Sequence, residues 1–224
     1  MMTRLVDLFK RAKRIRQTEG LLALVRQASA FVVRLFFQHQ SYYLYETYIH
    51  EVLKEGEAKH LPRIKDFTLK IVSTNREADE LEAEGLEFRS QVVNAREKLD
   101  KGTIAFCIFV GRELAYIGWI AMTEEAMKTA AAPPMKVDFA NDEIYALHVW
   151  TNPKYRGMGL APYGDFKTYQ FLEEKGKVVH RALVATDNVA SVKAWAKLTH
   201  PKIYAEARYL KILWWKSWKE KPLT

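Results

Sequence analysis

The residues best suited to chemistry lie in one short stretch, His148–Phe166, which reads HVWTNPKYRGMGLAPYGDF. Gly157 and Gly159 permit a tight turn and let the backbone approach a ligand closely. The amides after them begin a predicted helix, and a helix dipole favours an anion at this end. Arg156 adds a fixed positive charge whose forked donors suit a phosphate. The stretch therefore predicts a pyrophosphate site.

Two common phosphate loops do not fit this stretch. The Rossmann pattern G-x-G-x-x-G requires a third glycine, and Pro162 stands in its place. The P-loop requires Gly-Lys-Ser/Thr after its glycines, which the stretch lacks. The pattern that fits is R-x-x-G-x-A, formed by Arg156, Gly159 and Ala161. It resembles the coenzyme A pyrophosphate loop of the GNAT superfamily, the acyl-CoA-dependent N-acyltransferases.

A later segment, ATDNVASVKAWAKL, resembles the second cofactor motif of that superfamily, N-x-x-A/S-x-x-x-Y-x-K-x-G-F. The matching positions are Asn188, Ser191, Lys197 and Leu198. Trp195 stands where the family has the tyrosine that protonates the departing thiolate, and Thr199-His200 replaces Gly-Phe. An indole does not donate that proton usefully, so Tyr163 is the alternative acid. The departure also motivates a second hypothesis, a catalytically silent scaffold that still binds coenzyme A.

The resemblance implies acetyl-CoA, or another acyl-CoA, as cofactor. It implies a reaction in which the acyl group passes to a primary amine on a small molecule or a protein. Backbone amides near Val149–Thr151 are expected to polarise the thioester carbonyl, where negative charge develops. The expected cofactor-binding residues are Val149, Trp150, Thr151, Arg156, Gly157, Met158, Gly159, Leu160, Ala161, Asn188 and Ser191.

The reaction also needs a base, because an amine with a pKa of about 10.4 is almost fully protonated at pH 7. Glu143, Tyr145 and His148 are the candidates on the strand before the loop. In a regular strand Glu143 and Tyr145 share one face and His148 lies on the other. His148 is nearest the loop, and the ordinary pKa of histidine suits the task. Glu143 is the residue type that the family prefers, so both remain candidates.

The surrounding elements predict an α+β domain over residues 62–224. Its expected core is a mixed, mostly antiparallel sheet of six to seven strands flanked by helices, as in GNAT proteins. Apolar and β-branched runs predict strands at residues 67–72, 103–110, 113–122, 143–150 and 178–186, with one or two more in 202–218. Helices are expected from Asn75 as the cap, over 88–99, over 161–175 and over 188–199.

Residues 1–61 are expected to form a separate basic, helical segment. Residues 1–37 hold eight basic and two acidic side chains, so they carry +6 of the chain's net charge of +8. The remaining body is nearly neutral, which excludes nucleic acid as an expected partner. Leu5, Leu8, Ala12 and Ile15 recur at helical spacing.

A second apolar stretch, residues 20–37, contains Arg26 and Arg34. These two charges disfavour a bilayer span and favour a helix lying in the membrane interface. We therefore expect a cytoplasmic protein held at the inner face of the membrane. Packing of this segment on the domain, or on a second subunit in a homodimer, is the alternative.

Composition excludes several other classes of site. Cys107 is the single cysteine, so a disulfide scaffold and a cysteine-based zinc site are excluded. The six histidines show no metal-ligand spacing, so no metal is expected. Trp214, Trp215 and Trp218 alternate with lysines near the C-terminus, where they suit strand packing, a membrane interface or the lining of a site.

Overall fold

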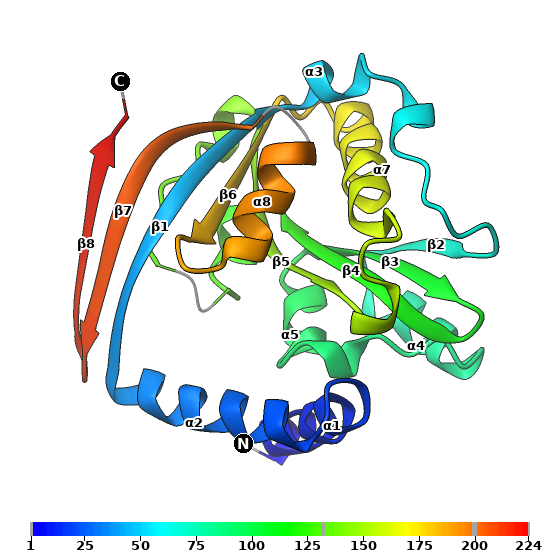
Figure 1. Ribbon diagram of the computed structural model, residues 1–224, viewed down its shortest axis with the longest axis horizontal. Helices are drawn as coiled ribbons and strands as arrows, with labels where there is room; N and C mark the ends of the chain where they lie inside the picture. The colour runs from blue at the N-terminus through cyan, green and yellow to red at the C-terminus, as the bar shows by residue number, and fades with distance from the viewer. Residues whose placement is uncertain (1, 131–132, 199–200, 224) are drawn as a thin grey trace.

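The protein, described by a computed structural model over residues 2–130, 133–198 and 201–223, is built on one eight-stranded sheet (Figure 1). The strand order is β2-β3-β4-β5-β6-β1-β7-β8, and β5 and β6 are the parallel pair among antiparallel neighbours. The predicted α+β class with a mixed, mostly antiparallel sheet is confirmed. The strands are β1 (Phe37–Tyr48), β2 (Thr68–Val72), β3 (Thr103–Val110), β4 (Glu113–Ala121), β5 (Glu143–Thr151), β6 (Val179–Ala185), β7 (Lys202–Ile212) and β8 (Trp215–Pro222).

Strand β1 accounts for the difference from the six to seven strands that we expected. It pairs with β6 along one edge and with β7 along the other, and it buries Leu44 and Tyr45. The expected N-terminal segment, residues 1–61, includes residues 37–48. Their pairing on both edges places these residues inside the sheet.

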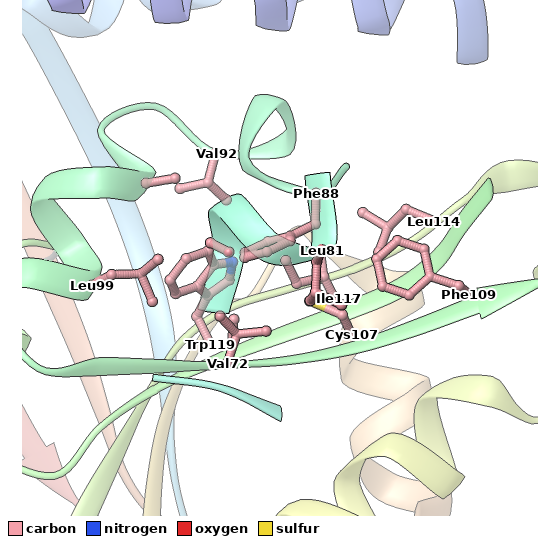
Figure 2. Close-up of a cluster of buried hydrophobic side chains, with 13 residues drawn as sticks. Val72, Leu81, Phe88, Val92, Leu99, Cys107, Phe109, Leu114, Ile117 and Trp119 are labelled. Atoms are coloured by element: carbon pink, nitrogen blue, oxygen red, sulfur yellow. The ribbon is translucent and has the colours of Figure 1, made fainter. Parts of the chain in front are cut away.

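Helices cover both faces of the sheet. The described helices are α1 (Met2–Thr18), α2 (Leu21–Phe36), α3 (Ile49–Leu53), α4 (Asn75–Ala83), α5 (Ala95–Asp100), α6 (Glu124–Met127), α7 (Leu160–Glu174) and α8 (Val189–Leu198). On one face α4 and α5 pack on β3 and β4, and Figure 2 shows Phe88 and Trp119 in this cluster with Cys107. On the other face Phe166, Tyr169 and Leu172 of α7 bury the opposite side of β3 and β4. Strands β3 and β4 are apolar on both faces because they are covered on both.

Two helix starts differ from the sequence expectation. Thr74, rather than Asn75, caps α4: its hydroxyl accepts the Glu77 amide, and the Glu77 carboxylate accepts the Thr74 amide in return. The helix expected over residues 88–99 is divided, because Asn94 adopts a left-handed φ of 60°. A short 3₁₀ turn precedes Asn94, and α5 follows it.

Helix α1 is anchored to the body of the protein. Ile15 is buried, and Arg14 Nη1 donates to Glu87 Oε2 at 3.0 Å and to Ser90 Oγ at 2.7 Å. The Arg14 guanidinium also lies 5.8 Å from the ring centroid of Trp150. Helix α2 then runs into β1 without a break (Figure 1). Across the described ranges, no helix combines the length and the apolar character that a bilayer crossing requires.

Candidate functional site

A bulge in β5 decides which side chains reach each face of the sheet. Trp119 of β4 pairs with His148, whereas the next residue, Ile120, pairs with Ala146. Leu147 is therefore an extra residue in β5, and it reverses the alternation of the strand. His148 consequently lies on the same face as Glu143 and Tyr145. Our expectation that it lies on the opposite face was wrong, because that expectation assumed a strand without a bulge.

Strands β5 and β6 diverge just before the bulge. Their parallel pairing is confined to Glu143–Val179, Ile144–His180 and Tyr145–Arg181. Beyond this point β5 stays paired with β4, and β6 stays paired with β1. Among the described strands, the edge of β5 that faces β6 thus has no partner over residues 146–151, and a wedge opens between the two neighbouring strands.

A narrow cavity lies at this wedge, on the face of the sheet that α7 and α8 cover. Its lining residues are Tyr116, Gly118, Trp119, Ile120, Ala146, Val149, Asp165, Thr168, Tyr169, His180 and Trp195. Two glycines make room for the ring of Tyr116. A Cβ on Gly118 would lie 2.8 Å from the Tyr116 hydroxyl oxygen, and a Cβ on Gly164 would overlap the ring carbon Cε1.

Asp165 is the carboxylic acid in this cavity lining. The Tyr116 hydroxyl donates a hydrogen bond to Asp165 Oδ1 at 2.8 Å. Burial raises the pKa of Asp165 to about 7, and the hydrogen bond from Tyr116 lowers it in part. A carboxyl group with this pKa can accept or donate a proton at neutral pH. We did not single out Asp165 from the sequence, although its spacing to Tyr169 and Leu172 predicts the buried face of α7.

The cavity also holds a stack of aromatic rings. The Tyr169 hydroxyl lies 3.0 Å from His180 Nδ1, and Trp195 stacks on the imidazole with centroids 5.6 Å apart. The centroid of the Trp195 ring also lies 5.3 Å from that of Tyr45. Burial lowers the pKa of His180 to about 3, so the imidazole is neutral. Its Nε2 atom is buried without a hydrogen-bond partner among the described residues.

The three candidate bases lie outside the cavity lining. Glu143 is held by an ion pair with Arg181, and its Oε2 accepts the Asp138 amide at 2.8 Å. Tyr145 is buried, which raises the pKa of its hydroxyl. His148 has a pKa lowered to about 4, chiefly by burial and then by the charges of Arg11 and Lys98.

The glycine loop has the backbone shape that an anion site needs. Gly157 and Gly159 have φ of 76° and 83°, in the left-handed region. A Cβ on Gly157 would meet no atom within 4 Å, whereas a Cβ on Gly159 would lie 3.2 Å from Pro62 Cα. Gly157 therefore faces open space. Gly159 also permits residues 61–63 to pack on the loop, where Arg63 N–H donates to the Met158 carbonyl at 2.9 Å.

The start of α7 supplies donors beside this loop. The first backbone bond into the helix runs from Tyr163 N–H to the Gly159 carbonyl at 3.2 Å. The amides of Leu160 and Ala161 precede it, so neither has a carbonyl partner inside the helix. Arg156 is exposed, and its Nε donates to the Thr151 carbonyl at 3.2 Å. A guanidinium, a glycine facing open space and helix-start amides suit a pyrophosphate.

Of the other residues predicted to bind the cofactor or supply the acid, some line the cavity and others lie outside it. Val149 lines the cavity, whereas the Trp150 ring lies under Arg14. Asn188 Oδ1 accepts the Ser191 amide at 3.2 Å, so both residues shape the start of α8. Tyr163, the alternative acid, packs against Phe67 with centroids 5.1 Å apart, outside the cavity lining. The side chains of Lys197 and Leu198, and residues Thr199-His200, lie outside the described part of the chain.

Comparison with family models gave no match, and comparison with curated proteins gave none. Among solved structures, the chain is similar to a tandem GNAT protein from the clavulanic acid biosynthesis pathway. The TM-score is 0.51 at 14% identity, and the match covers 88% of this chain and 59% of that chain, less than two thirds of its length.

Two further solved structures are similar at lower scores. A GCN5-related N-acetyltransferase-like protein from Streptococcus suis has a TM-score of 0.47 at 15% identity, covering 82% of this chain and 67% of that one. A GCN5-related N-acetyltransferase from Kribbella flavida has a TM-score of 0.47 at 13% identity, covering 82% and 63%. The strand order, the divergence of β5 and β6 and the match to the tandem protein lead to one conclusion: the chain has the GNAT fold.

Proposed function

We propose that the protein is an acyl-CoA-dependent N-acyltransferase, in the first instance an acetyltransferase, acting on a primary amine. One observation carries the proposal: β5 and β6 diverge beside the glycine loop that begins α7, and the cavity at the divergence contains an ionisable carboxyl group. This combination would supply an anion site, an open strand edge and a proton acceptor.

The residues present fit the cofactor. Arg156, Gly157 and the amides at the start of α7 would hold the pyrophosphate. The open edge of β5, from Ala146 to Thr151, offers backbone groups to the amides of the pantetheine arm. When bound, acyl-CoA supplies the acyl group in activated form, as a thioester.

Within the cavity, Asp165 is the proposed proton acceptor for the incoming ammonium group. With a pKa near 7, it is substantially ionised at neutral pH and still basic enough to take up a proton. The hydrogen bond from Tyr116 fixes the orientation of this carboxyl group. Tyr116 also takes the place of Tyr163 as the proposed source of the proton for the leaving thiolate, because its hydroxyl reaches the cavity.

Thiol release from acetyl-CoA, measured across a panel of primary amines, tests this proposal. The parent is expected to release coenzyme A with at least one amine, and the Asp165→Asn variant is expected to release it about 10²–10⁴-fold more slowly. Equal rates for parent and variant would remove Asp165 from the mechanism.

The silent scaffold remains the second candidate function. The packing of Trp195 against His180 and Tyr45 favours it, because an indole occupies the position of the family's usual acid. Binding of acetyl-CoA without thiol release for any amine in the panel would select this function over the first.

A further inference from the structure

Two exposed apolar segments, far apart in the sequence, meet at one corner of the molecule. Phe37, the first residue of β1, pairs with Ile212 at the end of β7, and Leu213 N–H donates to the Phe36 carbonyl at 2.6 Å. The C-terminal end of α2 and the turn between β7 and β8 are therefore in contact. Figure 1 shows this turn beside the junction of α2 and β1.

Helix α2 contributes a stripe of apolar side chains that are exposed to solvent. Leu22, Val25, Val32 and Phe36 recur at helical spacing on one side of α2, and each is more than half exposed. The turn contributes Leu213, about half exposed, and Trp214, 86% exposed, and Trp215, the first residue of β8, is also about half exposed. We call these seven residues the corner face. Exposed large apolar side chains that lie together mark an interaction surface, and here the turn contacts the end of α2 from which the stripe extends.

The turn between β7 and β8 has an unfavourable backbone conformation at its leucine. Leu213 has a φ of 55°, a region that glycine and asparagine adopt readily and leucine does not. Hairpin turns favour glycine, asparagine and aspartate at such positions. A leucine followed by a tryptophan at the tip of an exposed hairpin is therefore unfavourable for the stability of the turn. This choice of residues favours a role for the two side chains in binding.

The charge around the corner face has one sign. Residues 20–45 contain Arg26 and Arg34 and no acidic residue, and residues 207–219 contain four basic residues and no acidic residue. In the hairpin, Arg208 lies opposite Lys219 on one face and Lys211 lies opposite Lys216 on the other, so basic side chains flank the turn on both faces. Like charges opposite one another destabilise a strand pair in water, and a negatively charged surface nearby would offset that effect.

We propose that the corner face docks on an anionic lipid bilayer surface, with Trp214 and the α2 stripe in the interface and the basic side chains against the headgroups. Tryptophan at the headgroup level and apolar residues flanked by cations are the recurring features of such docking. A second copy of this chain fits less well, because a symmetric contact would bring two faces of the same positive charge together. The proposal concerns residues remote from the loop and cavity, and it does not depend on the acyltransferase proposal.

Vesicle co-sedimentation of the full chain tests this docking, without coenzyme A. The vesicles contain phosphatidylcholine alone or phosphatidylcholine and phosphatidylglycerol in equal parts. The double variant Leu213→Gly with Trp214→Ser removes the apolar tip and suits the backbone of the turn. A second variant, Leu22→Gln with Val25→Gln, changes the helix stripe and keeps good helix formers. Ile71→Thr, at an exposed apolar position on β2, is the matched control.

The parent and the control are expected to sediment with the anionic vesicles, and high salt is expected to weaken this binding. Each double variant is expected to bind about tenfold more weakly and to unfold at a temperature no lower than that of the parent, because Leu213→Gly relieves the strained turn. Equal binding of parent and variants, or equal binding to both kinds of vesicle, would overturn the proposal. Light scattering that shows a dimer which the tip variant dissociates would also overturn it, in favour of a second copy.

Discussion

Tyr116 donates a hydrogen bond to Asp165 at 2.8 Å, and Gly164 gives the Tyr116 ring the space to do so. The tyrosine comes from β4 and the carboxyl group from α7, so the contact joins the sheet to the helix that follows the glycine loop. Helix α7 therefore connects the proposed anion site at its start to the proposed proton acceptor one turn later. The chemistry assigned to the cavity rests on the close packing of these two elements.

Substitution of Gly164 tests that packing. Gly164→Ala would place a methyl group against the Tyr116 ring, and overpacking of this kind costs about 1–3 kcal/mol in free energy of unfolding. Chemical denaturation measures this loss. Glu174→Ala, at the exposed end of the same helix, is the control and should change stability by about 0.5 kcal/mol or less. A Gly164→Ala protein as stable as the parent would mean that Tyr116 is not held against α7.

The burial of Asp165 predicts a specific dependence of stability on pH. Its folded pKa of about 7 lies above the unfolded value of about 3.8, so the folded state binds the extra proton between these values. Asp165 therefore contributes about 2–4 kcal/mol to the free energy of unfolding below about pH 4, and this contribution is lost as the pH rises through 7. His148 and His180 act in the opposite direction, because their lowered pKa values cost stability as the pH falls below about 6.5.

The difference in unfolding free energy between the parent and Asp165→Asn isolates this contribution. The parent is expected to lose stability relative to the variant between pH 4 and pH 7, and to lose no more above pH 8. Denaturant titrations at four pH values measure the difference. A constant difference across this range would show that the Asp165 carboxyl has an ordinary pKa.

The pH dependence of turnover distinguishes the candidate bases. If Asp165 accepts the amine proton, kcat/KM rises with pH through an inflection near 7, and Asp165→Asn removes the inflection. Glu143→Gln should weaken the ion pair with Arg181, and thus lower stability, but keep the inflection. An inflection that disappears in Glu143→Gln and persists in Asp165→Asn would return the role to the strand carboxylate.

Much of the fold could be predicted because the local pattern of apolar residues agrees with the strands and helices of the structure. The apolar runs of β3 and β4 and the helix after the glycine loop are visible in the sequence alone. The place of β1 could not be predicted, because its partners β6 and β7 come far later in the chain and pairing at that distance leaves no local signal.

The site was less predictable for the same reason. The face that His148 occupies depends on how β5 pairs with β4, and the bulge at Leu147 is a property of the pair. The pKa of Asp165 depends on burial beside Tyr116, a residue of another element. The loop residues were identifiable because glycine and arginine at fixed spacing act mainly through their own backbone and side chain.

The central claim is that the loop at the start of α7 binds the pyrophosphate of an acyl-CoA. Calorimetric titration of the full chain with acetyl-CoA tests it most directly, with Arg156→Glu as the variant and Lys136→Glu, an exposed residue outside the loop, as the matched charge control. We predict saturable one-to-one binding by the parent and the control, and an affinity at least about tenfold lower for Arg156→Glu. Equal affinities for parent and variant, or no binding of acetyl-CoA, longer acyl-CoAs or free coenzyme A, would contradict the account.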